Sequence, residues 1–355
     1  MKYKDEMMKA LVHELQLRRN YLDNEAIETI YFGGGTPSIV PAKDIALLLN
    51  FIENNFELGS SVEITLEANP DDLNKTHLQH LYQSGINRLS IGVQSFHDRD
   101  LEWMNRAHKK SEAIDSIKRA QDIGIENISI DLIYGTPGLS DKEWKENICQ
   151  ALDLGVPHIS SYALTVEPQT ALGNWVEKKK MKPMDDEQAA LQFEILMNEL
   201  NANGFKHYEI SNFAKPGFYS RHNSSYWEGK KYLGIGPSAH SFNKSSRAWN
   251  IRNNAIYLKK INADELPSET EVLEQKDLFN EYLMISLRTA KGVDLNYMEN
   301  EFGSELFEEF KNNIQTFIEK KWLVLEKGFI KTTKQGKLMA DGIASELFIL
   351  DDKEQ

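Results

Sequence analysis

Three consecutive glycines, Gly33 to Gly35, follow an apolar run and precede Thr36 and Pro37. A glycine loop after a strand suggests phosphate binding, but no Gly-Lys-Ser/Thr sequence follows, and Ser38 stands where a dinucleotide fingerprint requires a third glycine or alanine. Glycines expose backbone amides and carbonyls to a ligand without a side chain in the way. We therefore expect the loop to bind an amino-acid head group, which carries an ammonium and a carboxylate; a tight turn alone is the alternative.

Two carboxylates lie within apolar, strand-like segments, Glu67 in LEANP and Asp131 in SIDLIYGTP. A carboxylate in such surroundings is costly unless it is paired. The two hydroxyls of a ribose, or a ligand ammonium, would satisfy either one. A salt bridge to Arg88 or Arg106 would do so without any ligand. Gln94, at the end of RLSIGVQ, is a weaker indication because glutamine often serves as a turn ligand.

The chain segments that position these residues alternate between strand-like and helix-like sequence patterns. The strand-like runs are AIETIYF, VEITLEAN, RLSIGVQS, ENISIDLIYG, HISSYALTVEP and HYEISNFA, and helical periodicity covers residues 41–56, 111–124, 141–155 and 185–204. Helix ends are marked by Gly85, Gly124, Gly155 and Gly204, which predict left-handed caps. The alternation predicts βα units and a parallel sheet, in which the strand carboxyl ends gather the unusual residues on one face.

Charge and hydropathy exclude several other classes of protein. Residues 1–19 interleave charges of both signs with apolar residues at helical spacing, which predicts an amphipathic helix and not a cleaved signal sequence. No apolar run approaches the roughly 18 residues of a spanning helix, so we expect no transmembrane segment and cytoplasmic residence. With 41 basic and 54 acidic residues, the net charge of −13 disfavours binding along a nucleic-acid backbone.

The pattern changes after about residue 250. Residues 271–303 indicate helix, break and helix, and residues 319–348 indicate a helix end, a short hairpin around Lys327 and Gly328, and a last helix. We expect a partial β/α barrel over residues 1–250 and a small winged-helix-like α+β domain over residues 260–350. Such domains often bind DNA, but this one has no strong basic excess, so no nucleic-acid partner is expected.

Cys149 is the one cysteine of the chain. A single thiol excludes an intramolecular disulfide and a cysteine-ligated metal centre built by this chain alone. Cys149 lies at helical spacing with Trp144, Ala151 and Leu152. We therefore expect a buried, structural cysteine.

Six motifs in this order and spacing carry a family resemblance: YFGGGTPS, EANP, RLSIGVQSF, DLIYGTPG, RHNSSYW and GIGPSAHSF. Together they resemble the radical S-adenosylmethionine (SAM) family that contains the oxygen-independent coproporphyrinogen III oxidases and the HemW-type haem chaperones. The resemblance covers nearly the whole chain. It implies an α/β fold, a partial (β/α)6 radical-SAM barrel whose first strand is missing here, followed by the small C-terminal domain.

The resemblance also implies ligand contacts. Gly34, Gly35 and Thr36 would hold the methionine moiety of SAM, Arg106 would suit its carboxylate, and Asp131 its ribose. The full set that the resemblance implies for SAM, or for a second copy of it, is Gly34, Gly35, Thr36, Glu67, Gln94, Arg106, Asp131, Ala163 and His240. It implies no catalytic side chain.

The family binds a [4Fe–4S] cluster through a CxxxCxxC loop after the first barrel strand, and this sequence contains no such loop. Either the chain is truncated or it has lost the chemistry. We expect the chain as written to hold no cluster and to perform no radical reaction. Iron–sulfur absorbance after anaerobic reconstitution would contradict this expectation.

Residues 205–249 contain ten aromatic side chains, which suggests a flat tetrapyrrole site. Within this stretch, RHNSSYW places His222 in what reads as an exposed loop. A neutral imidazole there would supply the axial bond to haem iron, and Arg221 would meet a propionate. The HNxxYW motif resembles the haem-binding motif of HemW-type chaperones and not that of the oxidases, which implies a haem pocket that includes Tyr226 and Trp227.

We therefore expect a HemW-type haem chaperone that binds haem and SAM and delivers haem to apo-proteins. One alternative is an oxygen-independent coproporphyrinogen III oxidase, which decarboxylates propionates by radical chemistry in porphyrin biosynthesis. A non-catalytic SAM-binding remnant is the other. The expected partners are haem or a porphyrin and a haem-receiving apo-protein.

Overall fold

The computed structural model describes residues 3–165 and 185–350. Its contacts divide the chain into two compact units. We call Ile30–Ile45 together with Glu63–Tyr219 the barrel unit, and Met1–Thr29, Ala46–Val62 and Ser220–Gln355 the terminal unit.

A seven-stranded sheet has the strand order β1-β2-β3-β4-β5-β7-β6. Its strands are β1 (Ile27–Phe32), β2 (Leu58–Ala68), β3 (Arg88–Gln94), β4 (Asn127–Tyr134), β5 (His158–Ala163), β6 (Lys206–Glu209) and β7 (Asn212–Ala214). Strands β2 to β5 pair in parallel, whereas β7 is antiparallel to both β5 and β6. The predicted α/β half-barrel is confirmed. The run HYEISNFA, however, is two short strands, because the chain turns at Ile210 and Ser211.

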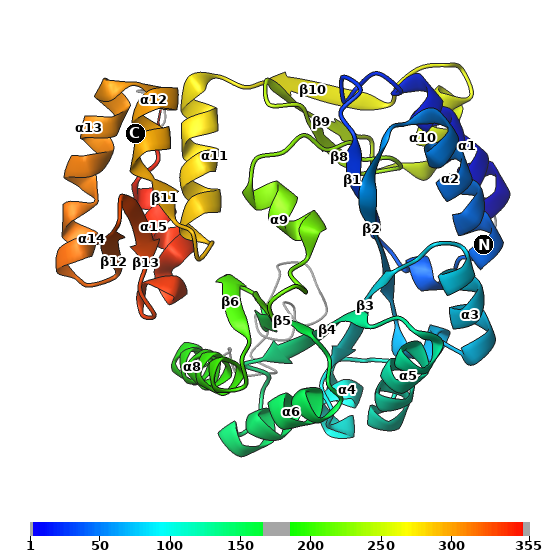
Figure 1. Cartoon of the computed structure of the whole chain (residues 1–355), viewed down its shortest axis with the longest axis horizontal. Coiled ribbons are helices and arrows are strands. Elements are labelled where there is room, and N and C mark those ends of the chain that lie inside the picture. The colour runs from blue at the N-terminus through cyan, green and yellow to red at the C-terminus, as the bar shows by residue number, and fades with distance from the viewer. Residues whose placement is uncertain (1–2, 166–184, 351–355) are drawn as a thin grey trace, which may run out of the picture. The chain divides into compact units, whose positions relative to one another are not determined.

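Helices alternate with these strands, as the sequence predicts. They are α2 (Ala42–Asn55), α3 (Lys75–Gln83), α4 (Asp98–Trp103), α5 (Lys110–Ile123), α6 (Asp141–Asp153) and α8 (Asp186–Ala202). Figure 1 shows α3, α5, α6 and α8 on one side of the curved sheet. The predicted left-handed caps are present; at the end of α5, for example, Gly124 has a φ of 101° and the Ile125 amide donates to the Ala120 carbonyl.

Cys149 is exposed, so the expectation of a buried cysteine is wrong. Helix α6 buries Trp144, Asn147, Ile148 and Ala151, which share one face. Cys149 follows Ile148 by about 100° around the helix axis and therefore points away from that face.

The N-terminal helix α1 (Lys4–Leu17) packs against α10 (Asn254–Ile261) in the terminal unit. Glu14 on α1 is fully buried, with 0% of its surface exposed. One carboxylate oxygen accepts from Arg18 Nε at 2.9 Å and Asn250 Nδ2 at 2.7 Å, and the other from the Tyr257 hydroxyl at 2.6 Å and the Gly236 amide at 2.8 Å. This network fixes α1 to α10 and to the loop that contains Gly236.

A second sheet of the terminal unit has the order β10-β9-β8 and is antiparallel. Its strands are β8 (His240–Phe242), β9 (Ser246–Asn250) and β10 (Ser268–Val272). The short helix α9 (Arg221–Trp227) precedes it.

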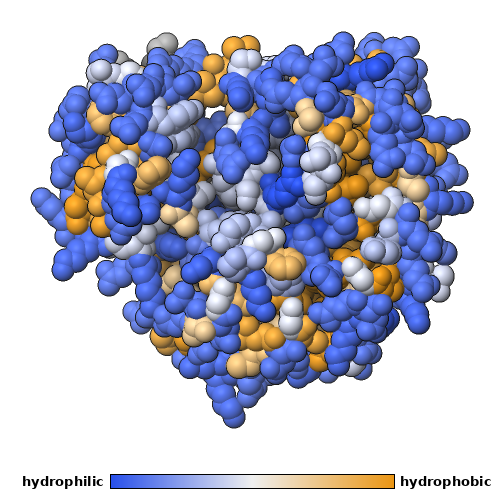
Figure 2. All heavy atoms as spheres, viewed as in Figure 1, coloured by the Kyte–Doolittle hydropathy of each residue, from blue (hydrophilic) through white to orange (hydrophobic). Residues whose placement is uncertain are grey.

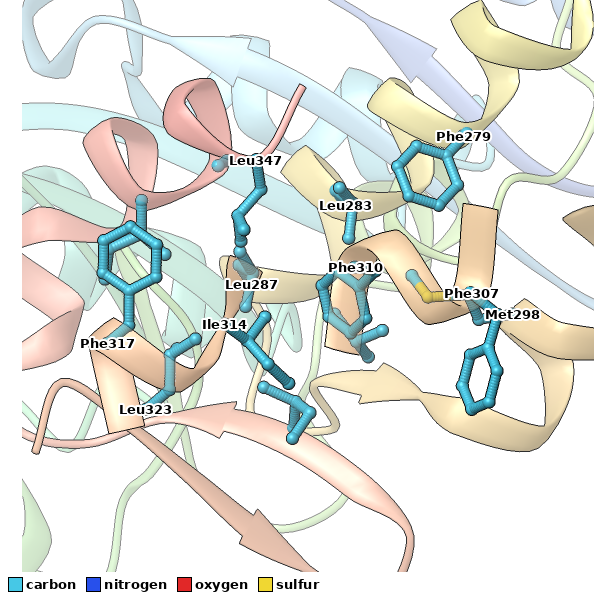
Figure 3. Close-up of a cluster of buried hydrophobic side chains, with 14 of the residues drawn as sticks. Phe279, Leu283, Leu287, Met298, Phe307, Phe310, Ile314, Phe317, Leu323 and Leu347 are labelled. Atoms are coloured by element: carbon cyan, nitrogen blue, oxygen red, sulfur yellow. The ribbon is translucent and has the colours of Figure 1, made fainter. Parts of the chain in front are cut away.

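The C-terminal part of the chain has the predicted winged-helix arrangement. Its elements are α11 (Gln275–Leu287), β11 (Val293–Asp294), α12 (Leu295–Phe302), α13 (Ser304–Asn313), α14 (Gln315–Glu319), β12 (Leu323–Glu326), β13 (Phe329–Thr332) and α15 (Ala340–Glu346). The hairpin turns at Lys327 and Gly328, whose φ values of 51° and 85° are both in the left-handed region. A separate core of side chains such as Phe279, Leu283 and Phe310 holds these elements together (Figure 3).

No helix within residues 3–165 and 185–350 is long and apolar enough to cross a membrane. The face shown in Figure 2 is largely hydrophilic, with hydrophobic residues scattered in small groups.

Candidate functional site

The glycine loop follows β1 and is held by Glu67 on β2. One Glu67 oxygen accepts from the Tyr31 hydroxyl at 2.7 Å, and the other accepts from the Gly34 amide at 3.2 Å. Gly34 and Gly35 have φ values of 75° and 69°, and no atom of residues 3–165 and 185–350 lies within 4 Å of a Cβ built on either. These two positions therefore favour glycine for their backbone, and they leave open space beside the loop.

Gly33 is needed for close packing. A Cβ on Gly33 would lie 2.6 Å from Tyr31 Cε1 and 3.0 Å from Glu67 Oε1. We expect Gly33→Ala to displace the Tyr31 ring and to lower the free energy of unfolding by about 1–3 kcal/mol, measured by urea denaturation. Gly342→Ala on α15, where a Cβ would meet no described atom within 4 Å, is the matched control and should not lower the free energy of unfolding. An unchanged midpoint for Gly33→Ala would show that the loop has room for a side chain.

Arg106 and Gln94 lie together beside the end of β3. Arg106 Nη2 donates to Asn69 Oδ1 at 2.8 Å and to the Gly92 carbonyl at 3.0 Å. Its Nε is buried and has no partner among the described residues. Gln94 has a φ of 70°, at an irregularity in the β3–β4 register. A residue other than glycine with a positive φ, such as Gln94, often marks a functional site. The N–H at Arg106 Nε, which has no partner among the described residues, suits a carboxylate ligand.

Asp131 lies on β4 opposite Ser160 on β5. Burial raises the pKa of Asp131 to about 7, although the hydrogen bond from Ser160 acts in the opposite direction. The charge of Glu67 raises this pKa further, and the charges of Arg106 and Arg88 lower it. Asp131 is thus a carboxylate whose charged form is poorly stabilised within the chain.

A polar network on one face of β4 and β5 was missed by the sequence analysis. His158 Nδ1 lies 2.7 Å from Ser129 Oγ, and His158 Nε2 lies 2.7 Å from the Tyr208 hydroxyl. Ser129 Oγ is 3.2 Å from Ser160 Oγ, which connects the network to Asp131. The sequence did contain an indication of this network, because the polar residues occupy alternate positions inside otherwise apolar strands and therefore share one face of the sheet.

The structure places the remaining residues implied for SAM in different units. Thr36 follows the glycines directly and precedes a short 3₁₀ turn, Pro37–Ile39. Ala163 is the exposed last residue of β5. His240 is exposed at the start of β8 in the terminal unit, with its ring centroid 6.4 Å from that of Trp249. The barrel unit therefore contains every residue of the implied set except His240, and the assignment of the set to SAM stays a prediction.

The segment RHNSSYW forms helix α9, so the expectation of an exposed loop is wrong. Its short polar residues suggested an exposed loop, but Ser220 caps a helix by accepting from the Asn223 amide at 3.2 Å. His222 is half-buried, and its Nδ1 lies 3.0 Å from Thr29 Oγ1 on β1. Burial lowers the pKa of His222 to about 4. The imidazole is therefore neutral near pH 7.

The predicted aromatic stretch is divided between the two units. Phe205, for example, is a core residue of the barrel unit. In the terminal unit a row of rings begins at His222: the centroids of His222 and Tyr226 are 5.0 Å apart, those of Tyr226 and Tyr232 4.7 Å, and those of Tyr232 and Phe242 6.0 Å. Burial raises the pKa of Tyr226 to about 12. The row provides aromatic surface next to His222.

Arg221 and Trp227, at the two ends of α9, have different surroundings. Arg221 donates to the Glu28 carboxylate and to the Ser61 carbonyl. Trp227 lies against Arg288, whose Cζ is 5.8 Å from the indole centroid. A propionate at Arg221 would have to compete with Glu28.

The donors required for an iron–sulfur cluster are not among the described residues. Within residues 3–165 and 185–350, no group of three or more His, Cys, Asp or Glu side chains could hold a metal ion. The CxxxCxxC loop of the family supplies three thiolates to its [4Fe–4S] cluster, and Cys149 is the one cysteine of this sequence, so the residues present do not fit the cluster. The glycine loop and Arg106 Nε, which is buried without a partner among the described residues, in contrast fit a ligand that carries an amino-acid head group.

A curved sheet of parallel strands with polar residues near their carboxyl ends is the architecture of the radical SAM proteins. The model of the Radical SAM superfamily matches residues 9–148, and the model of the HemN C-terminal domain matches residues 273–339. The second match falls within the winged-helix part of the chain.

Whole-chain comparisons agree. Heme chaperone HemW of Bacillus subtilis is 34% identical over 341 residues, which span 96% of this chain and 90% of that protein. Heme chaperone HemW of Lactococcus lactis is 34% identical over 348 residues, which span 98% of this chain and 90% of that protein. Coproporphyrinogen III oxidase (HemN) from Escherichia coli shares the fold, with a TM-score of 0.83 at 21% identity over 98% of this chain and 84% of that chain. The chain belongs to the radical SAM family that contains the HemW and HemN proteins.

Proposed function

We propose that this protein binds haem through His222 and SAM through the glycine loop, and that it transfers haem to apo-proteins. The observation that carries the proposal is the state of His222, a neutral imidazole held by Thr29 beside a row of aromatic rings. The similarity to proteins named heme chaperone HemW supports it.

Iron ligation needs a neutral imidazole whose lone pair lies on the ligating nitrogen. In the tautomer in which Nδ1–H donates to Thr29 Oγ1, the lone pair is on Nε2, and this hydrogen bond would orient the ring for ligation. Because burial lowers the pKa of His222 to about 4, protons do not compete with iron near neutral pH. Haem would supply the iron that accepts this lone pair. Its apolar macrocycle would pack on Tyr226.

In the barrel unit, SAM would place its methionine moiety at Gly34 and Gly35 and its carboxylate at Arg106 Nε. An ionised Asp131 would accept hydrogen bonds from the ribose hydroxyls. The proposal contains no step through a [4Fe–4S] cluster, since the described donors do not fit one.

A haem titration followed at the Soret band tests the proposal. We expect saturable binding by the unaltered chain, and an affinity at least roughly 100-fold weaker for His222→Ala because the bond to iron is lost. Thr29→Val, which keeps the shape but removes Oγ1, should bind roughly 10-fold more weakly. His80→Ala, which alters an exposed histidine on α3, is the matched control and should bind normally.

Binding that is indifferent to His222 would contradict the proposal and favour the oxidase or the SAM-binding remnant. Delivery is tested separately, by mixing the haem-loaded protein with a haem-free acceptor and following the Soret shift. Haem that stays on the chain would contradict the transfer step alone.

A further inference from the structure

Arg288 and Trp227 meet within the terminal unit, where the end of α11 lies beside α9 (Figure 1). The distance of 5.8 Å from Arg288 Cζ to the indole centroid is near the outer limit of a cation–π contact, about 6 Å. Trp227 follows His222 by five residues, which is about 7.5 Å along the helix axis and about 140° around it. The contact therefore lies less than two turns from the proposed iron ligand, on a different face of α9.

Two buried N–H donors in this contact have no acceptor within the described part of the chain, namely Trp227 Nε1 and Arg288 Nε. A buried donor without a partner is costly, and more so when it belongs to a charged group. Both atoms can only donate. An acceptor would satisfy both, and an anion would suit the guanidinium best.

Arg288 already has one anionic neighbour. Its Nη1 donates to the Asp341 carboxylate. The Asp341 side chain is 61% exposed, so water screens this ion pair. Arg288 Nε still has no acceptor among the described residues and could donate to a second carboxylate.

We propose that Trp227 Nε1 and Arg288 Nε bind a carboxylate, and that this carboxylate is a propionate of the haem whose iron His222 holds. The inference rests on the proposed haem binding. It replaces Arg221 as the propionate contact, because Arg221 is occupied by Glu28 and Ser61. The winged-helix part of the chain would thereby contribute directly to haem binding through Arg288.

The test compares haem with haem dimethyl ester, whose propionates carry no charge, in Soret titrations of the full chain. We expect Arg288→Leu and Trp227→Phe each to weaken haem binding roughly 10-fold or more, because each removes a hydrogen bond to a charged group. The diester should bind the unaltered chain and both variants equally. Asp341→Asn, the matched control, should keep or increase the haem affinity because it leaves both donors in place.

Each other outcome overturns the inference. Unchanged haem affinity in both variants, with binding still dependent on His222, would remove the carboxylate site and leave the proposed function standing. Equal losses for haem and its diester would show that Arg288 supports α9 without contacting a propionate. No saturable haem binding by the unaltered chain would remove both proposals. Trp227→Phe keeps the ring packing, so it decides the question if Arg288→Leu fails to fold.

Discussion

Replacing Glu14 with alanine is expected to lower the free energy of unfolding by about 3–5 kcal/mol, the usual effect of removing one member of a buried ion pair. The Glu14 and Arg18 side chains are 0% and 4% exposed. The substitution would leave Arg18 Nε, the Tyr257 hydroxyl and the Gly236 amide without this acceptor, while Arg18 Nη2 keeps its hydrogen bond to Asn250 Oδ1. Urea denaturation followed by circular dichroism measures the change.

Two further variants make this test specific. Glu6→Ala, at an exposed position on the same helix, should change the free energy of unfolding by less than about 0.5 kcal/mol. Replacing Glu14 and Arg18 together by leucine and methionine should restore part of the loss, because apolar residues in place of both charges leave no unpaired ion. A loss below about 1 kcal/mol for Glu14→Ala would show that water reaches the network.

Asp131 is expected to make stability depend strongly on pH. Its pKa is about 7 in the folded protein, against an ordinary value of 3.8. The folded state therefore binds this proton more tightly than the unfolded chain, and the resulting stability is present below about pH 4 and is lost as the pH rises through about 7. We expect the unaltered chain to lose about 4 kcal/mol relative to Asp131→Asn between about pH 4 and about pH 8.

Denaturation of both proteins at several pH values measures this difference. Burial also lowers the pKa of His158, which reduces stability as the pH falls, but this contribution is present in both proteins and cancels in the comparison. Asp115→Asn, at an exposed position on α5, should follow the unaltered chain at every pH. If the free energy of unfolding varied with pH in the same way for Asp131→Asn and the unaltered chain, Asp131 would be shown to be solvated.

The sequence predicted the features that depend on neighbours along the chain. The period of the apolar residues indicated the helices and strands, and the glycine positions indicated the left-handed caps and the turn at Gly328. Features set by tertiary contacts were missed. RHNSSYW is a helix capped by Ser220, although the sequence reads as an exposed loop.

The same distinction applies to the candidate site. Glu67 and Asp131 could be singled out because a carboxylate in an apolar strand needs a partner. The partners themselves, Tyr31 for Glu67 and Ser160 for Asp131, come from other strands and follow only from the register. Trp227 Nε1 and Arg288 Nε, which have no acceptor in the part of the chain that the structure describes, come together through a contact between residues 61 positions apart, which no local pattern indicates.

The terminal unit is assembled from three separate stretches of chain. Gly236 and Tyr257, two partners of Glu14, lie 222 and 243 residues further along. At about 5–20 residues per second, a ribosome would produce Tyr257 roughly 10 to 50 s after Glu14. Strands β2 to β5 pair with their sequence neighbours and can associate as they emerge. Docking of α1 is thus expected to be the late step in biosynthesis, and until then its inner face, which carries Ala10, Leu15 and the Glu14 carboxylate, is open to chaperones and proteases.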